Sequence, residues 1–255
     1  MATSVTSAGR VTGRGAPYAH GMPVDVRRAG DRFHTVLDWL DSWHSFSFGG
    51  HHDPENTHHG LLLVNNDDRI AGGGGFGEHP HADMEIVTWV LEGELAHRDS
   101  TGTHDVISPG LAQRMSAGRG IRHSEVNASA EHEVHLVQMW VLPDERGIDP
   151  GYEQRDLSAA IAGGGLVPVA SGRGHDGAVS LHQHEAVLWV GRLQPAAVIT
   201  VPDAPHAHVF VAVGNATLEG SGELATGDAA RLTEAGSLAV TAGDAGAEVL
   251  IWETA

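Results

Sequence analysis

Short runs of β-branched and apolar residues, separated by turn signals, fill most of this chain. Residues 85–100, EIVTWVLEGELAHRDS, have the pattern of a strand, a Glu-Gly turn and a second strand. HEVHLVQMWVLP at 132–143 is a further β run, which ends at Pro143. Helical periodicity is nearly absent, and only 155–165 indicate a short helical turn. The 34 glycines among 255 residues supply many tight turns. The sequence therefore predicts an all-β protein.

The strand pattern recurs in the second half of the chain. AVSLHQHEAVLWVGRL, AAVITVP, AHVFVAVGNATLEG and GAEVLIWETA are short strand-like runs at similar spacing. The Pro-, Gly- and charge-rich stretch 143–165 is a natural linker. We therefore expect a flexible leader at 1–20, an N-terminal barrel with a metal site at 21–145, and a C-terminal barrel without metal at 146–255.

Charge and composition exclude several functions. The formal net charge is −18 and none of the fifteen basic residues is lysine, which disfavours direct binding to nucleic acid or to anionic membranes. The absence of cysteine excludes disulfides, thiolate nucleophiles and cysteine zinc sites. The sequence has neither a signal-peptide core nor an apolar run of roughly 18 residues, so we expect a cytoplasmic protein.

Two histidines one residue apart, His79 and His81, form the first candidate metal-binding pair. Side chains at i and i+2 share one face of a strand, so both rings point the same way. Pro80 places the segment at a sheet edge or at the start of a strand. Glu85 lies further along the same face if the strand stays regular. In a chain with 19 histidines, one such pair fits ordinary structural histidines equally well.

A second pair strengthens the metal interpretation. MSAGRGIRHSEVN at 115–127 places His123 and Glu125 at i and i+2 after another glycine turn. Two facing strands with one pair each would supply three imidazoles and one carboxylate, a set that suits an octahedral metal with open positions. The alternative is a capping His123 beside a surface Glu125. Strand alternation leaves both Glu85 and Glu125 open as the carboxylate ligand.

Both segments resemble a known family. The first resembles the first cupin motif through Gly73, His79, His81, Glu85 and Gly93; the second resembles the second motif through Gly110, Gly118, His123 and Asn127, with two extra residues before the histidine and Ser116 where proline is usual. More specifically, LDSWHSFSFGGHHDP, FGEHPHADMEIVTWVLEGELAHRDS, MSAGRGIRHSEVN and GYEQR are similar to a bacterial pirin, strongly over about 25–155.

The pirin resemblance implies two tandem cupin-type (double-stranded β-helix) barrels in a monomer. It implies one divalent metal in the N-terminal barrel, Fe(II) before Cu, Mn, Ni or Zn. The implied ligands are His79, His81, His123 and Glu125. Ordinary cupins would use Glu85 as the carboxylate ligand. On the pirin pattern Glu85 instead supports the metal ligands from outside or has a structural role.

The resemblance also implies an activity. Several pirins resemble flavonol 2,3-dioxygenases, which cleave quercetin-like flavonols with O2, and Glu125 would then also act as general base. Phe48 and Phe76 are candidates for the substrate pocket. The alternative is an iron-dependent redox-sensing regulatory protein that binds a partner protein.

The remaining histidines lack such a context. The pairs His182/His184 and His206/His208 have no convincing partner segment, so we expect no second metal site. The histidines of the 51–59 loop fit solvated positions better than a lid over the metal. We expect surface or strand-edge positions for His97, His104, His132 and His135.

Overall fold

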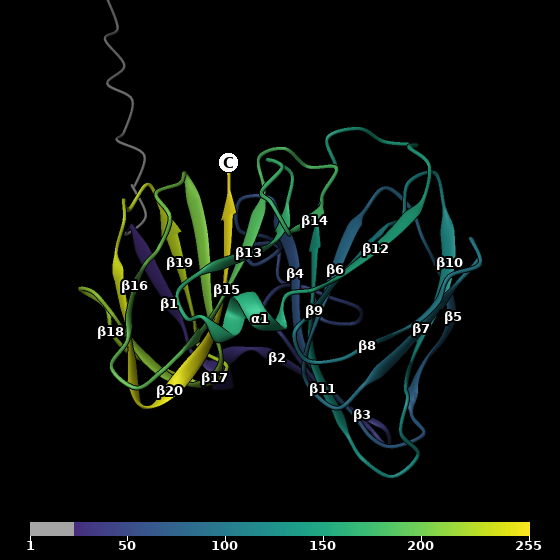
Figure 1. Cartoon of the computed structure of the whole chain (residues 1–255), viewed down its shortest axis with the longest axis horizontal. Helices are drawn as coiled ribbons and strands as arrows, with labels where there is room; N and C mark the ends of the chain where they lie inside the picture. The colour runs from purple at the N-terminus through teal and green to yellow at the C-terminus, as the bar shows by residue number, and fades with distance from the viewer. Residues whose placement is uncertain (1–22) are drawn as a thin grey trace, which may run out of the picture.

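The computed structural model describes residues 23–255, which form two β-barrels side by side (Figure 1). The expected leader at 1–20 lies outside the described residues. Apart from the 3₁₀ turn η1 (Ala29–Asp31) and the helix α1 (Ser158–Ala162), the regular structure is all strand. The expected all-β architecture of two barrels is confirmed. No helix in the described part of the chain has the length and apolar character needed to cross a membrane.

The first barrel consists of two sheets. A seven-stranded sheet has the order β12 (Gly151–Asp156), β9 (Leu111–Ser116), β6 (Glu85–Glu92), β11 (Val134–Val141), β4 (Leu62–Ile70), β3 (Leu40–His44) and β2 (Phe33–Leu37). A four-stranded sheet has the order β5 (Gly75–His81), β10 (Ile121–Asn127), β7 (Leu95–Asp99) and β8 (His104–Ile107).

The second barrel is built from one nine-stranded sheet. Its main path is β1 (Val24–Arg27), β19 (Ala229–Thr233), β17 (His206–Leu218), β20 (Ala239–Thr254), β15 (Val187–Leu193), β13 (Val167–Ser171) and β14 (Val179–Ser180). Two further strands pair with this path, β16 (Val198–Thr200) with β20 and β18 (Gly222–Ala225) with β17.

Strand pairing crosses the expected domain boundary in both directions. β1 pairs with β19 and lies among the strands of the C-terminal barrel (Figure 1). β12 pairs with β9 of the first barrel. β1 and β12 thus each pair across the boundary expected near residue 145. These pairings join segments far apart in sequence, and no local pattern indicates them.

The seven-stranded sheet is buried on both faces, so its central strands carry two distinct sets of side chains. On β6, Thr88 and Val90 point into the first barrel. Val87 and Trp89 point the other way, into an apolar core shared with strands of the second barrel. β11 divides in the same way. The barrels are thus packed against each other through a continuous core rather than tethered by a linker.

A buried polar contact crosses this shared core. The indole Nε1 of Trp89, which is fully buried, donates a hydrogen bond of 2.8 Å to Glu248 Oε1. Arg192 Nε donates to the other oxygen of Glu248 at 2.8 Å. The carboxylate therefore retains a cationic partner within its own barrel while accepting a bond from the other barrel.

Because the core is shared, we expect the two barrels to unfold together. Trp89→Ala should lower the free energy of unfolding by about 3–5 kcal/mol, the usual cost of removing a large buried aromatic side chain. Urea titration followed by far-UV circular dichroism should show a single transition at a lower midpoint. Two separated transitions, with only one of them shifted, would contradict the shared core.

Candidate metal centre

Pairing of β5 with β10 brings the two predicted histidine segments together. His79 lies directly opposite His123 in the register, and His81 lies opposite Ile121. The ring centroids are 4.4 Å apart for His79 and His123 and 4.9 Å apart for His81 and His123. One nitrogen of each ring lies within 4.8 Å of the others. The three side chains can therefore contact one metal ion.

Close packing of the two strands depends on a glycine. Gly75 begins β5 with φ of 153°, and a Cβ added there would lie 2.4 Å from the Cα of Val126 on β10. Any larger residue would push the strands apart. Gly75 thus permits the close approach that places His79 opposite His123.

Glu125 joins the cluster through an irregularity in the same pair of strands. The register shifts between His123 and Glu125, so Glu125 lies opposite Phe76. Its carboxylate lies within 4.8 Å of ligand atoms of His97 and His123. Gln138 Nε2 donates to Glu125 Oε2 at 2.7 Å, whereas the Thr88 hydroxyl lies at 3.5 Å from Oε1. One carboxylate oxygen is therefore firmly held, and the other has only a weak partner.

Protonation of the histidines suits metal binding. His79 Nδ1 lies 2.7 Å from the carbonyl oxygen of Gly77, so Nδ1 carries the proton and Nε2 presents a lone pair. Burial, and then the neighbouring imidazoles, lower the pKa of His81 to about 4 and that of His123 to about 3. Both rings are neutral near pH 7, the form that binds metals.

One contact of the protein fits a metal at this site. The Nε2 atoms of His79 and His123 are only 3.0 Å apart. Without a metal, one of them must carry the proton of a hydrogen bond; with a metal, both lone pairs can bind the same cation. Three imidazoles with one carboxylate are a donor set that a divalent transition metal accepts.

His97 contradicts its expected surface position, since it is buried beside the cluster. In the register it lies opposite Glu125, and Asp99 lies opposite His123. His97 Nε2 donates to Asp99 Oδ2 at 3.0 Å, while Nδ1 has no partner. Burial raises the pKa of Asp99, but hydrogen bonds from Thr101, His97 and the Thr103 amide outweigh it and lower the pKa to about 2. The i/i+2 spacing of His97 and Asp99 was the sequence signal that both side chains lie on the same face of one strand.

Glu85 lies outside the cluster. The strand does not stay regular after His81: the chain turns at Asp83, which has φ of 51°, and Glu85 begins β6. There it shares a face with Val87 and Trp89, toward the second barrel. Its Oε2 accepts hydrogen bonds from the Ser116 hydroxyl and the His182 amide, each at 3.0 Å. Glu85 was expected either to support the metal ligands or to serve the fold, and we propose that it serves the fold.

The other histidines fall into two groups. His104 and His132 are exposed, but His135 is buried, contrary to expectation, and bonds Asp67 at 2.7 Å. In the 51–59 loop His52 and His58 are exposed, while His51 and His59 are half-buried and bond Thr35 and the Leu232 carbonyl. Within residues 23–255 both groups of three possible metal ligands lie in the first barrel, and neither includes the pairs His182/His184 or His206/His208.

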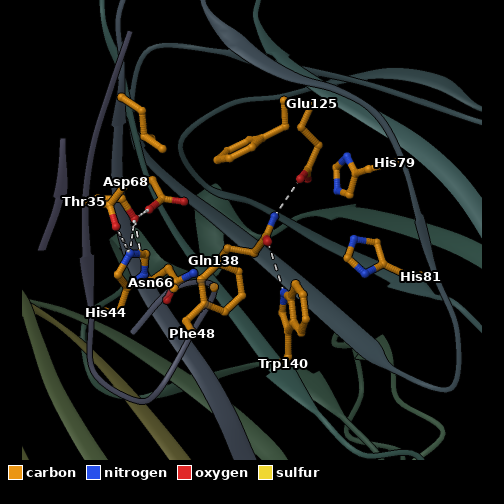
Figure 2. Close-up of a pocket in the computed structure, with 15 residues that line it drawn as sticks. Thr35, His44, Phe48, Asn66, Asp68, His79, His81, Glu125, Gln138 and Trp140 are labelled. Atoms are coloured by element: carbon orange, nitrogen blue, oxygen red, sulfur yellow. Dashed lines mark hydrogen bonds between the residues drawn. The ribbon is translucent and has the colours of Figure 1, made fainter. Parts of the chain in front are cut away.

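The cluster opens into a cavity of about 350 Å³ inside the first barrel (Figure 2). His79, His81 and Glu125 line one side of it. Phe48 and Phe76, the two predicted pocket residues, also line it. Gln138 and Trp140, which the sequence analysis did not single out, belong to the same wall. A volume of this size accommodates a small organic ligand.

Trp140, Gln138 and Glu125 are joined by two successive hydrogen bonds along this wall (Figure 2). Trp140 Nε1 donates to Gln138 Oε1 at 3.1 Å, which fixes the amide so that its nitrogen faces Glu125. The signal for this role was a polar Gln138 on the face of β11 that otherwise carries Val134, Leu136 and Trp140.

Comparison with known proteins agrees with the fold. Residues 25–141 match the pirin family, and residues 168–254 match the quercetinase C-terminal cupin domain. A putative quercetin 2,3-dioxygenase of Mycobacterium tuberculosis is 57% identical over 90% of this chain and 94% of that protein. Quercetin 2,3-dioxygenase of Escherichia coli K12 is 40% identical over 89% and 97%.

A solved structure extends the likeness to the whole fold. The bacterial pirin YhhW of Escherichia coli, in complex with nickel(II), superimposes with a TM-score of 0.83 at 38% identity, covering 91% of this chain and 98% of that chain. The fold of two cupin barrels is thus shared with this pirin over nearly the full length. This chain belongs to the pirin family.

Proposed function

We propose that this protein is a metal-dependent dioxygenase of pirin type, which cleaves a flavonol-like aromatic ring system with O2. The observation that carries the proposal is that His79, His81 and Glu125, each within reach of His123, line a cavity that also has aromatic walls. The same reaction class is supported by the quercetin 2,3-dioxygenase at 40% identity and by the putative one at 57% identity.

The proposed ligands are His79, His81, His123 and Glu125. We propose Fe(II) as the resident metal; because a pirin of Escherichia coli forms a complex with nickel(II), Ni(II) is a further candidate. The bound metal would act as a Lewis acid that increases the acidity of a coordinated hydroxyl group. Copper, manganese and zinc accept the same donors, so each should be compared by reconstitution of the metal-free protein.

Glu125 is the proposed general base for the substrate hydroxyl. Gln138 fixes one carboxylate oxygen, and the other has only the 3.5 Å contact with Thr88. The second oxygen is therefore available to accept a proton or to contact the metal. Phe48 and Trp140 provide ring faces and edges that would hold a flat aromatic substrate beside this carboxylate.

We expect His123→Ala to lose bound metal and flavonol turnover together, because His123 faces both other histidines. His79→Ala and His81→Ala should behave alike. Metal content after dialysis is measured by mass spectrometry, and turnover by oxygen-dependent loss of quercetin. His104→Ala, an exposed histidine on β8, is the matched control and should keep both. Full metal content in His123→Ala would exclude it as a ligand, and no turnover by fully metallated wild type would contradict the enzymatic proposal.

Glu125→Gln separates the two roles of this residue. Loss of a general base should lower kcat by about a hundredfold or more. Metal content should fall less, since three histidines remain. Unchanged kcat in a metallated Glu125→Gln variant would remove Glu125 from the base role.

Gln138→Leu tests whether the hydrogen bond from Gln138 to Glu125 serves the reaction. Residues that orient a metal-site carboxylate typically change activity by about tenfold to a hundredfold. We expect a loss of kcat in that range with metal retained. Trp140→Phe keeps an aromatic ring but loses the hydrogen bond to the Gln138 amide, and it should lower kcat less. Wild-type kcat in Gln138→Leu would show that the hydrogen bond to Glu125 does not serve the reaction.

A further inference from the structure

A second group of polar side chains lines the cavity opposite the metal cluster (Figure 2). They come from the adjacent strands β2, β3 and β4 and comprise Thr35, Ser42, His44, Asn66 and Asp68. In the sheet register Ser42 lies opposite both Thr35 and Asp68, and His44 lies opposite Asn66. The group therefore forms a continuous polar patch on the inner face of the barrel.

Asp68 is the member of this patch whose burial destabilises the folded state most. It is only 3% exposed, and its one hydrogen bond among the described residues comes from the Ser42 hydroxyl to Oδ1. Arg32 does not serve it, because this guanidinium bonds Asp67 on the opposite face of the strand at 3.2 Å. Burial, with the charges of Asp67 and Glu125, raises the pKa of Asp68 to about 7. A buried carboxyl group without a cation destabilises the fold, so folding does not account for it.

The rest of the patch is held in place yet has unused hydrogen-bonding capacity. Thr35 Oγ1 lies 3.0 Å from His44 Nε2 and 3.0 Å from His51 Nε2, which fixes both rings. Asn66 Oδ1 is buried without a partner. A buried polar atom in a cavity wall indicates a place for a ligand atom.

Aromatic rings connect this patch to the metal cluster. His44 stacks on Phe48 at 5.2 Å between centroids, and Phe48 meets Trp140 edge-on at 5.5 Å. Trp140 in turn meets His81 at 4.9 Å. The two polar ends of the cavity are thus joined by a series of aromatic rings, an apolar surface against which a flat ring system can pack.

We propose that Asp68, Ser42, His44 and Asn66 bind phenolic hydroxyl groups at the far end of a substrate whose near end lies at the metal cluster. The inference rests on the proposed function and narrows its substrate class to flat aromatics with hydroxyl groups at both ends. A phenol can donate to Asp68 or to Asn66 Oδ1. At this end of the cavity Asp68 is a lining residue and no lysine or arginine lies among the lining residues, so the patch offers no cation to a carboxylate or phosphate group.

Two flavonols distinguish the ends of the cavity. 3-Hydroxyflavone carries only the metal-binding hydroxyl, whereas quercetin adds hydroxyl groups on its outer rings. Dissociation constants are measured by quenching of tryptophan fluorescence in the metal-loaded protein without oxygen. We expect wild type to bind quercetin about tenfold or more tightly than 3-hydroxyflavone, the range for hydrogen bonds to a charged or strongly polar group.

Asp68→Leu should bring the two constants within about twofold of each other, because the lost hydrogen bond serves only quercetin. Its affinity for 3-hydroxyflavone should not change. Ser42→Ala is the second variant, with a partial loss of preference, should Asp68→Leu fail to fold. Asp67→Asn is the matched control: it removes the neighbouring carboxylate on the other face and its ion pair with Arg32. Loss of the Asp67 charge lowers the pKa of Asp68 but leaves this acceptor in place, so the full preference should remain despite lower stability.

The outcomes are distinguishable. Loss of preference in Asp68→Leu and Ser42→Ala, but not in Asp67→Asn, supports the inference. If both flavonols bind and the Asp68 and Ser42 variants discriminate as wild type does, or if wild type has no preference, the distal site is wrong while the proposed function stands. If wild type binds neither flavonol, the proposed flavonol activity fails and the distal site fails with it.

Discussion

The register between β5 and β10 is the constraint on which the metal centre depends. It places His79 opposite His123, and the irregularity after His123 brings Glu125 to the same side. A slip of one residue would turn every side chain of the strand to the other face and separate the ligands. Gly75 supports this register, since a side chain at this position would collide with the backbone of Val126.

The two faces of the seven-stranded sheet connect the site to the second barrel. Thr88 and Gln138 reach Glu125 from β6 and β11, while Trp89 and Met139 on the same strands pack in the shared core. The residues that position Glu125 are thus held on strands that the second barrel supports from behind. A barrel that has no metal cluster among its described residues still contributes to the precision of the site through packing.

Sequence patterns predicted the strands, the two barrels and the histidine segments, because strand alternation and i/i+2 spacing are local. They left Glu85 and Glu125 open, since a positive φ at Asp83 redirects the chain and cannot be deduced from alternation. His97 was misplaced because its contact with the cluster comes through pairing of β7 with β10. The Asp68 patch likewise depends on pairing of β3 with β4. The placement of β1 in the second barrel and of β12 in the first also depends on pairing between separate segments of the chain.

The most direct measurement is anomalous diffraction from crystals of the metal-loaded protein, recorded at the absorption edge of the bound metal. The expected result is one strong peak in the first barrel, in contact with the imidazoles of His79, His81 and His123 and with the carboxylate of Glu125. A peak bound instead by His97 and Asp99, or in the second barrel, would contradict the ligand set. So would a metal held by Glu85.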